Sequence, residues 1–112
     1  MSETPAPAAA VARDGDCLRV SGPLTMETVP AAVEAGIAAL TPEIRRIDLS
    51  GVAGVDSAAV ALLLEWVKNA RDPVVIEGAP APLRTLAKLY SMDGVLPFSV
   101  ADGQGAPTAA PR

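Results

Sequence analysis

The residues with the clearest chemical potential are the pair Asp56-Ser57, which stands directly before a long apolar run. An Asp in this position is typical of a helix N-cap, and the first helical turn offers free N–H groups and the positive end of the helix dipole. A phosphate or other anionic group on Ser57 would be favoured there. The same two residues also suit an ordinary helix start, so the pair alone predicts only a cap.

The residue types that the sequence lacks exclude several kinds of catalytic site. The sequence contains no histidine and a single cysteine, Cys17, so neither a Ser-His-Asp triad nor a Cys/His zinc site can form within the chain. Asp48 and Asp56 have no base or metal-ligand cluster beside them in the sequence, and the glycines at 51–54 lack the lysine and spacing of a Walker loop. We therefore expect no catalytic residue, no metal and no cofactor.

Length and charge restrict the partners. A chain of 112 residues with a net charge of −4 is the size of one domain and has no basic stripe to neutralise nucleic-acid phosphates. The longest unbroken apolar run, Ala58 to Leu64, is too short to cross a bilayer. No charged-then-apolar leader opens the sequence. We expect a cytoplasmic protein that binds no nucleic acid and does not insert into the membrane.

Both ends of the sequence are rich in Pro and Ala and lack apolar periodicity. Such segments bury too little apolar surface to offset the entropy of ordering them. We predict disordered tails at residues 1–10 and 101–112 and a folded domain at residues 11–100.

Apolar periodicity predicts alternating strands and helices. The strand-helix-strand step from Ile44 to Ile76 implies a right-handed parallel crossover. We expect one α/β (α+β) domain, with a mixed sheet of four to five strands packed against three to four helices. The predicted elements are strands at 11–13, 17–20, 44–49 and 74–76, helices at 25–40, 56–70 and 82–90, and an extended segment at 95–98.

Three boundaries depend on local signals. Ser21-Gly22-Pro23 is expected to end the second strand, and residues 50–55 are expected to form a loop. Thr25 is the expected N-cap of the first helix, although Pro30 also allows a start near Val29. The predicted buried stripe of this helix comprises Met26, Val29, Val33, Ile37 and Leu40.

The second predicted helix is apolar almost all round, which indicates cover on more than one side, part of it from a partner. Trp66 within it is expected in the core, with an interface anchor as the alternative. Tyr90 is expected in the core by its period, and it is also a candidate anchor. Arg84 is expected on a solvated face, with contact to an acidic partner as the alternative.

Two segments resemble a known family. Residues 47–64, Ile47-Asp48-Leu49-Ser50 through Asp56-Ser57 to the apolar helix, are similar to the signature of STAS domains. The segment Leu83–Tyr90, followed by Val95-Leu96-Pro97, resembles the ending of MlaB-like members. The similarity covers residues 13–98. Ala59-Val60 stands where the family usually has Gly-Leu, which is expected to reshape the contact made there.

The resemblance implies a non-catalytic protein that acts by docking. Its partner would be the MlaF-like ATPase of a phospholipid-transport ABC complex that maintains outer-membrane lipid asymmetry, and the chain would lie at the inner membrane through that complex. The implied partner-binding residues are Asp56, Ser57, Ala58 and Ala59. The alternative is an anti-sigma-factor antagonist, switched when a partner serine kinase phosphorylates Ser57. A ligand-binding STAS module is a third interpretation, for which no residue indicates a ligand.

Overall fold

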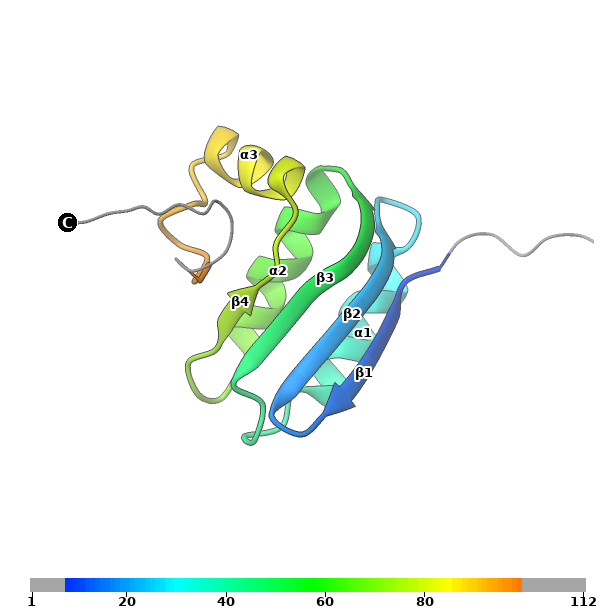
Figure 1. The fold of residues 1–112 in the computed structure, drawn as a ribbon, viewed down its shortest axis with the longest axis vertical. Helices are drawn as coiled ribbons and strands as arrows, with labels where there is room; N and C mark the ends of the chain where they lie inside the picture. Colours follow the sequence, from blue (N-terminus) through cyan, green and yellow to red (C-terminus); the bar gives the residue numbers. More distant parts are fainter. Residues whose placement is uncertain (1–7, 100–112) are drawn as a thin grey trace, which may run out of the picture.

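The computed structural model describes residues 8–99 as a four-stranded mixed sheet with three helices (Figure 1). The expected α/β domain is therefore confirmed, and most of the two predicted tails lies outside the described residues. The elements are β1 (Ala10–Asp14), β2 (Cys17–Leu24), α1 (Val29–Ala39), β3 (Arg46–Val55), α2 (Ser57–Asn69), β4 (Val75–Glu77) and α3 (Ala81–Leu89).

The sheet has the order β1-β2-β3-β4. β1 pairs with β2 in an antiparallel hairpin, whereas β2–β3 and β3–β4 are parallel pairs joined through α1 and α2. Both of these helices lie on the same face of the sheet, and α3 lies at the end where β3 finishes (Figure 1). The beginning of α2 and the loop before α1 are thereby brought to one end of the molecule.

The segment after α3 extends the sheet beyond β4. The Ile76 amide donates to the Pro97 carbonyl at 2.9 Å, and the Ser99 amide donates to the Ile76 carbonyl at 2.8 Å. These bonds flank a parallel bridge between Ile76 and Phe98. The predicted extended segment at 95–98 is therefore confirmed only around Phe98, because the Val95 and Leu96 amides bond back to the Met92 carbonyl in a turn.

Arg84 fastens α3 to this added segment. Its guanidinium carbon lies 4.9 Å from the centre of the Phe98 ring, and its Nη2 donates to the Ser99 carbonyl at 2.9 Å. The side chain is half-buried, so the expectation of a solvated Arg84 was wrong. A periodic pattern could not show this contact, because the ring that Arg84 covers lies fourteen residues further along the chain.

β2 and β3 are both longer than predicted. Residues 21–23 did not end β2, because Gly22 adopts a φ of 84° and lets the strand continue through two register shifts. The expected loop at 50–55 is the second half of β3, where Ser21 pairs with Gly51 and Leu24 pairs with Val55. The extended pairing carries both strands to the end of the sheet where α2 begins.

α1 starts at Val29, which confirms the later of the two predicted starts. The Thr28 hydroxyl donates to the Pro23 carbonyl at 2.7 Å and accepts the Thr25 amide at 3.0 Å. Thr25 is thus part of the preceding loop and not the N-cap. The hydrogen-bonded Thr28 side chain is 8% exposed and fixes the path of the chain into the helix.

The buried face of α1 differs from the predicted stripe. Met26 lies in the loop and is 68% exposed, and Ile37 is 38% exposed. Val29 is buried as predicted, and the buried face also includes the small residues Ala32 and Gly36. Small side chains are selected here because α1 packs closely against α2.

Trp66 is the largest side chain of the core and is fully buried. Its indole Nε1 donates to the Val33 carbonyl of α1 at 3.1 Å, and the ring lies directly over Gly36. The expectation that Trp66 belongs to the core is confirmed, and its alternative role as an interface anchor was wrong. The other fully buried large side chains are Leu18, Leu24, Ile44, Ile47, Leu49, Leu62, Leu63, Ile76 and Leu83.

The contact between α1 and α2 gives a stability prediction. A methyl group at Gly36 would overlap the Trp66 ring, so we expect Gly36→Ala to lower the free energy of unfolding by about 2 kcal/mol. Gly54→Ala is the matched control, because a methyl group there meets nothing within 4 Å. In urea unfolding, the control should leave the free energy of unfolding unchanged or raise it slightly. Equal effects of the two substitutions would contradict the packing argument.

Candidate functional site

The first turn of α2 is organised by the carboxylate of Asp56. One oxygen, Oδ1, accepts the Ala58 amide at 2.8 Å, which caps the helix as predicted. The other, Oδ2, accepts the Met26 amide at 3.0 Å from the loop before α1. The Asp56 amide also donates to the Leu24 carbonyl at 3.3 Å. One side chain therefore joins the end of β2, the loop and the start of α2 into a single unit.

The residues implied as partner-binding have different exposures. Ser57 is exposed and Ala58 is half-buried, so this side of the first turn is open to a partner. Ala59 is fully buried within the domain, and its implied role as a direct contact was wrong. Ala59 belongs to the core cluster, so the methyl group that replaces the family's usual Gly packs inside the domain.

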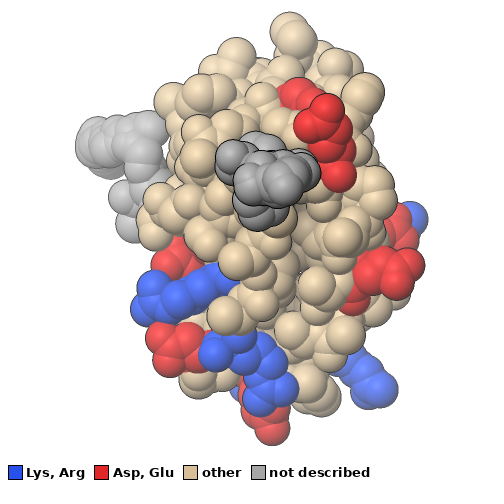
Figure 2. All heavy atoms as spheres, turned by 90° about the vertical axis from the view of Figure 1, so that its right-hand side faces the viewer, with Lys and Arg blue, Asp and Glu red and all other residues tan. Residues whose placement is uncertain are grey.

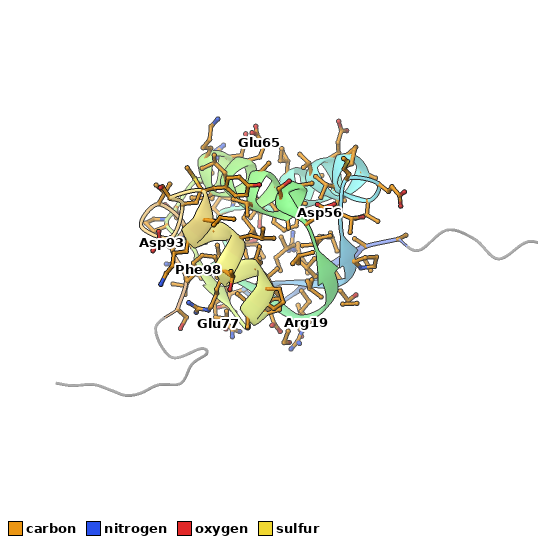
Figure 3. All side chains as sticks on the ribbon, turned by 90° about the horizontal axis from the view of Figure 1, so that it is seen from above. Arg19, Asp56, Glu65, Glu77, Asp93 and Phe98 are labelled. Atoms are coloured by element: carbon orange, nitrogen blue, oxygen red, sulfur yellow. The ribbon has the colours of Figure 1, made fainter. Side chains whose placement is uncertain are left out.

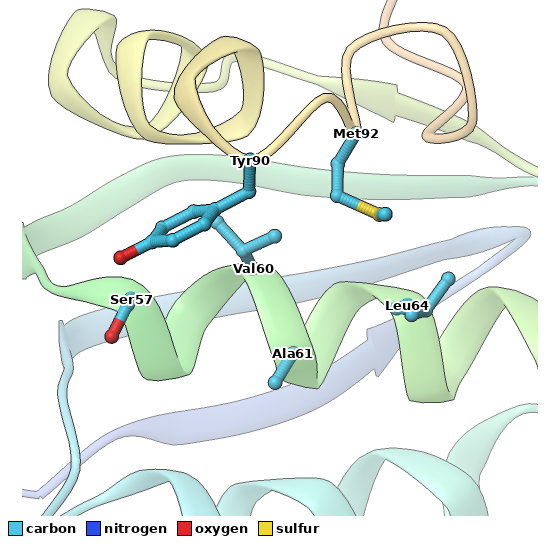
Figure 4. A pocket seen from close by; sticks show the side chains of 6 residues that line it. All are labelled: Ser57, Val60, Ala61, Leu64, Tyr90 and Met92. Atoms are coloured by element: carbon cyan, nitrogen blue, oxygen red, sulfur yellow. The ribbon is translucent and has the colours of Figure 1, made fainter.

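A groove with apolar walls runs along α2 from Ser57 (Figure 4). It has a volume of about 300 Å³ and lies between α2 and the turn after α3. In Figure 4 the Tyr90 ring lies over the first turn of α2, and Met92 lies nearer to Leu64. The described lining residues are Ser57, Val60, Ala61, Leu64, Tyr90 and Met92.

Tyr90 forms the outer wall of this groove and is 50% exposed. Its predicted core position was wrong, because α3 ends at Leu89 and the chain turns there. Ser91 has a φ of 59°, with its amide bonded to the Lys88 carbonyl at 3.0 Å. A left-handed residue after a helix is a common helix stop, and here it directs Tyr90 and Met92 towards α2.

A second hollow of about 290 Å³ adjoins the first turn of α2 on its other side. Its described lining residues are Thr25, Met26, Glu27 and Asp56. Figure 3 looks onto this end of the molecule and shows Asp56 at the beginning of α2. On the face drawn in Figure 2, most Lys and Arg atoms lie in the lower half, and the uppermost part shows only acidic and uncharged atoms.

The sheet face opposite α1 and α2 has a different character. Arg19 pairs with Asp14 at 3.0 Å and with Asp48 at 3.2 Å. Arg46 pairs with Asp16 at 3.0 Å and with Glu77 at 3.3 Å. Both arginines are thus paired within the chain, so a ligand would have to displace existing ion pairs to use them.

Two groups on that face have shifted pKa values. Burial raises the pKa of the Cys17 thiol, which disfavours its thiolate form. Burial also acts to raise the pKa of Asp48, but hydrogen bonds from Ser50 and the charges of Arg19 and Arg46 outweigh it and hold that pKa below its usual value. Both shifts are typical of structural groups.

The described residues that line the groove offer little acid–base chemistry. Among the described lining residues of the groove, none is a base that could activate the Ser57 hydroxyl. Within residues 8–99, no three His, Cys, Asp or Glu side chains come together as metal ligands. The arrangement instead presents an exposed hydroxyl at a fixed helix start, between an apolar and an acidic hollow.

Comparison with known families defines the class of protein. A family model described as "Mlab, STAS domain" matches residues 9–97, which cover most of the described chain and include the whole site. The chain is therefore a STAS domain protein. Within that class it belongs to the MlaB-like family.

Two further findings complete the comparison. No curated protein matches the sequence. In the part of the chain that the structure describes, no helix has both the length and the apolar character that a membrane crossing requires.

Several residues of the site could not be recognised from the sequence alone. Met26 fits the apolar stripe predicted for the first helix and Glu27 fits its first turn, yet both lie in the loop before α1 and line the second hollow. Met92-Asp93-Gly94 predicts a turn after the last helix. Neither this signal nor the apolar run that includes Leu64 could place the two side chains in one groove, because that requires the tertiary fold.

The double role of Asp56 predicts a large effect of its removal. Asp56→Ala deletes the cap and leaves the Met26 amide without its acceptor, and we expect a loss of about 2 kcal/mol in the free energy of unfolding. Ser57→Ala, one residue away and exposed, should change stability by less than about 0.5 kcal/mol. Urea unfolding of both variants is the measurement, and similar stabilities would show that the carboxylate does not organise this end.

The lowered pKa of Asp48 predicts a pH dependence. A carboxyl with a depressed pKa in the folded state stabilises it above the unfolded pKa, and this contribution is lost as pH falls through the folded pKa. The difference in unfolding free energy between the wild type and Asp48→Asn should be largest above about pH 5 and shrink below about pH 3. A difference that stays constant over this range contradicts the assignment.

Proposed function

We propose that this chain is a non-catalytic subunit that binds the cytoplasmic ATPase of an MlaFEDB-like phospholipid-transport ABC complex. The observation that carries the proposal is the open groove beginning at Ser57, at a helix start held rigid by Asp56, in a chain of the MlaB-like family. The ATPase binds the nucleotide, and this chain contributes a docked surface. It would thereby serve the transport that maintains outer-membrane lipid asymmetry.

The physical mechanism is a difference in affinity between states of the ATPase. A subunit that binds the assembled or competent state more tightly shifts the population towards that state without any chemistry of its own. A rigid docking surface supports this role, because less conformational entropy is lost when the partner binds. Asp56 provides such rigidity by fixing the helix start and the adjacent loop together.

The contact must extend beyond the groove. A stable protein interface buries about 800 Å² on each partner, which a hollow of this size cannot supply alone. Exposed large apolar side chains can contribute to this wider surface. Met26 lies at the second hollow, Tyr90 lies at the groove, and Leu89 precedes Tyr90 at the end of α3. The chain would lie in the cytoplasm, peripheral to the inner membrane through its partner.

A second candidate function is an anti-sigma-factor antagonist. The exposure of Ser57 at a helix start favours it, because a partner kinase could reach the hydroxyl. Incubation with the cognate serine kinase and ATP, followed by intact mass measurement, separates the two functions. Rapid gain of one phosphate at Ser57 would favour the antagonist.

The proposal predicts loss of a complex when the site is blocked. On co-expression with the MlaF-like ATPase and its permease, wild-type chain should co-purify, and Ser57→Trp should reduce recovery about tenfold because the bulky ring occupies the docking surface. Ala38→Trp is the matched control. Ala38 is exposed near the C-terminal end of α1, away from the groove, so this variant should bind normally.

Activity of the complex gives the second measurement. ATPase activity of the purified complex should fall when this chain is omitted and when Ser57→Trp replaces it. Absence of co-purification of the wild type, together with unchanged ATPase activity without it, would overturn the proposed function.

A further inference from the structure

The two hollows both reach the start of α2. Ser57 lines the apolar groove and Asp56 lines the hollow beside the loop before α1. Because the two residues are consecutive, their Cα atoms are only about 3.8 Å apart. A single segment of a partner can therefore reach both hollows at once.

The two hollows differ in chemistry. The groove wall is formed mainly by aliphatic and aromatic side chains, which suits an apolar side chain. The other hollow carries Glu27 and Asp56, and none of its described lining residues is Lys or Arg. A positively charged side chain is the group that this second hollow would attract.

The carboxylates of the second hollow retain capacity for a partner. Six acidic side chains of the described chain pair internally with Lys or Arg; these are Asp14, Asp16, Glu43, Asp48, Glu65 and Glu77. The ion pairs found among residues 8–99 include neither Glu27 nor Asp56. Glu34, Asp72 and Asp93 take part in none of these pairs either, but only Glu27 and Asp56 line the second hollow. The Asp56 oxygens each accept one amide, which leaves lone pairs for a further donor.

From these observations we infer that the partner segment carries one apolar side chain and one Lys or Arg, placed on either side of Ser57. The apolar side chain enters the groove beside Ala61, and the cation binds at Glu27 and Asp56. This inference rests on the proposed function, since it describes how the ATPase would contact the same site. The apolar contact supplies most of the affinity, and the charge fixes the orientation of the segment.

The test uses full-length chain and the purified MlaF-like ATPase in isothermal titration calorimetry. Ala61→Gln narrows the groove without changing charge, and we expect it to weaken binding about tenfold. Glu27→Lys reverses the charge of the second hollow and should weaken binding about fivefold. Both positions are exposed, so the fold should persist, as circular dichroism and thermal unfolding would verify.

Matched controls on α1 separate local from general effects. Ala38→Gln repeats the steric change and Glu34→Lys repeats the charge reversal, each at an exposed position outside both hollows. Both controls should bind within about twofold of the wild type. Added salt should weaken the wild type more than Glu27→Lys, because the variant has lost the screened attraction.

The possible results distinguish the inference from the proposed function. If the wild type binds but Ala61→Gln and Glu27→Lys match their controls, the two-hollow inference is overturned and the proposed function stands. If Glu27→Lys and Glu34→Lys weaken binding equally, the cation is attracted by general charge and the specific site is overturned. If the wild type does not bind, the proposed function itself fails.

Discussion

The hydrogen bonds of the Asp56 carboxylate are the interaction on which the functional end of this molecule depends. Bonds to the Ala58 and Met26 amides link a helix start with a loop thirty residues earlier in the sequence. A helix N-terminus and a surface loop would otherwise be among the most mobile parts of a small domain. Their linkage turns two separate chain segments into one surface with a fixed shape.

That surface exists because the rest of the fold brings its parts to one end. The long pairing of β2 with β3 delivers the loop before α1 and the start of α2 side by side. Trp66 and Gly36 then hold α1 and α2 in close contact beneath it. At the other side of α2, the left-handed Ser91 turns the chain so that Tyr90 and Met92 face the helix. Core packing and turn geometry thus define the groove, although few of these residues face a partner.

Local signals in the sequence were sufficient for part of this structure. The order of elements, the cap at Asp56 and the core position of Trp66 followed from periodicity and cap chemistry, which act over a few residues. The continuation of β2 past Gly22 could not be predicted, because Ser21-Gly22-Pro23 is a turn signal in the sequence. The strand continues only because β3 pairs with it while Gly22 adopts a positive φ. The burial of Ala59 and the contact between Arg84 and Phe98 depend on distant elements in the same way.

The distribution of charge is what separates the two large surfaces of the domain. On the open sheet face, Arg19 and Arg46 each lie between two acidic side chains, so both cations are already paired and a partner would have to break existing ion pairs to use these side chains. At the start of α2, Glu27 and Asp56 have no such cation among the described ion pairs, and apolar side chains adjoin them. Binding at this end therefore buries apolar area and adds an attraction between the carboxylates and a cation, and no existing ion pair has to break first. For this reason the start of α2 is better suited to docking than the open sheet face.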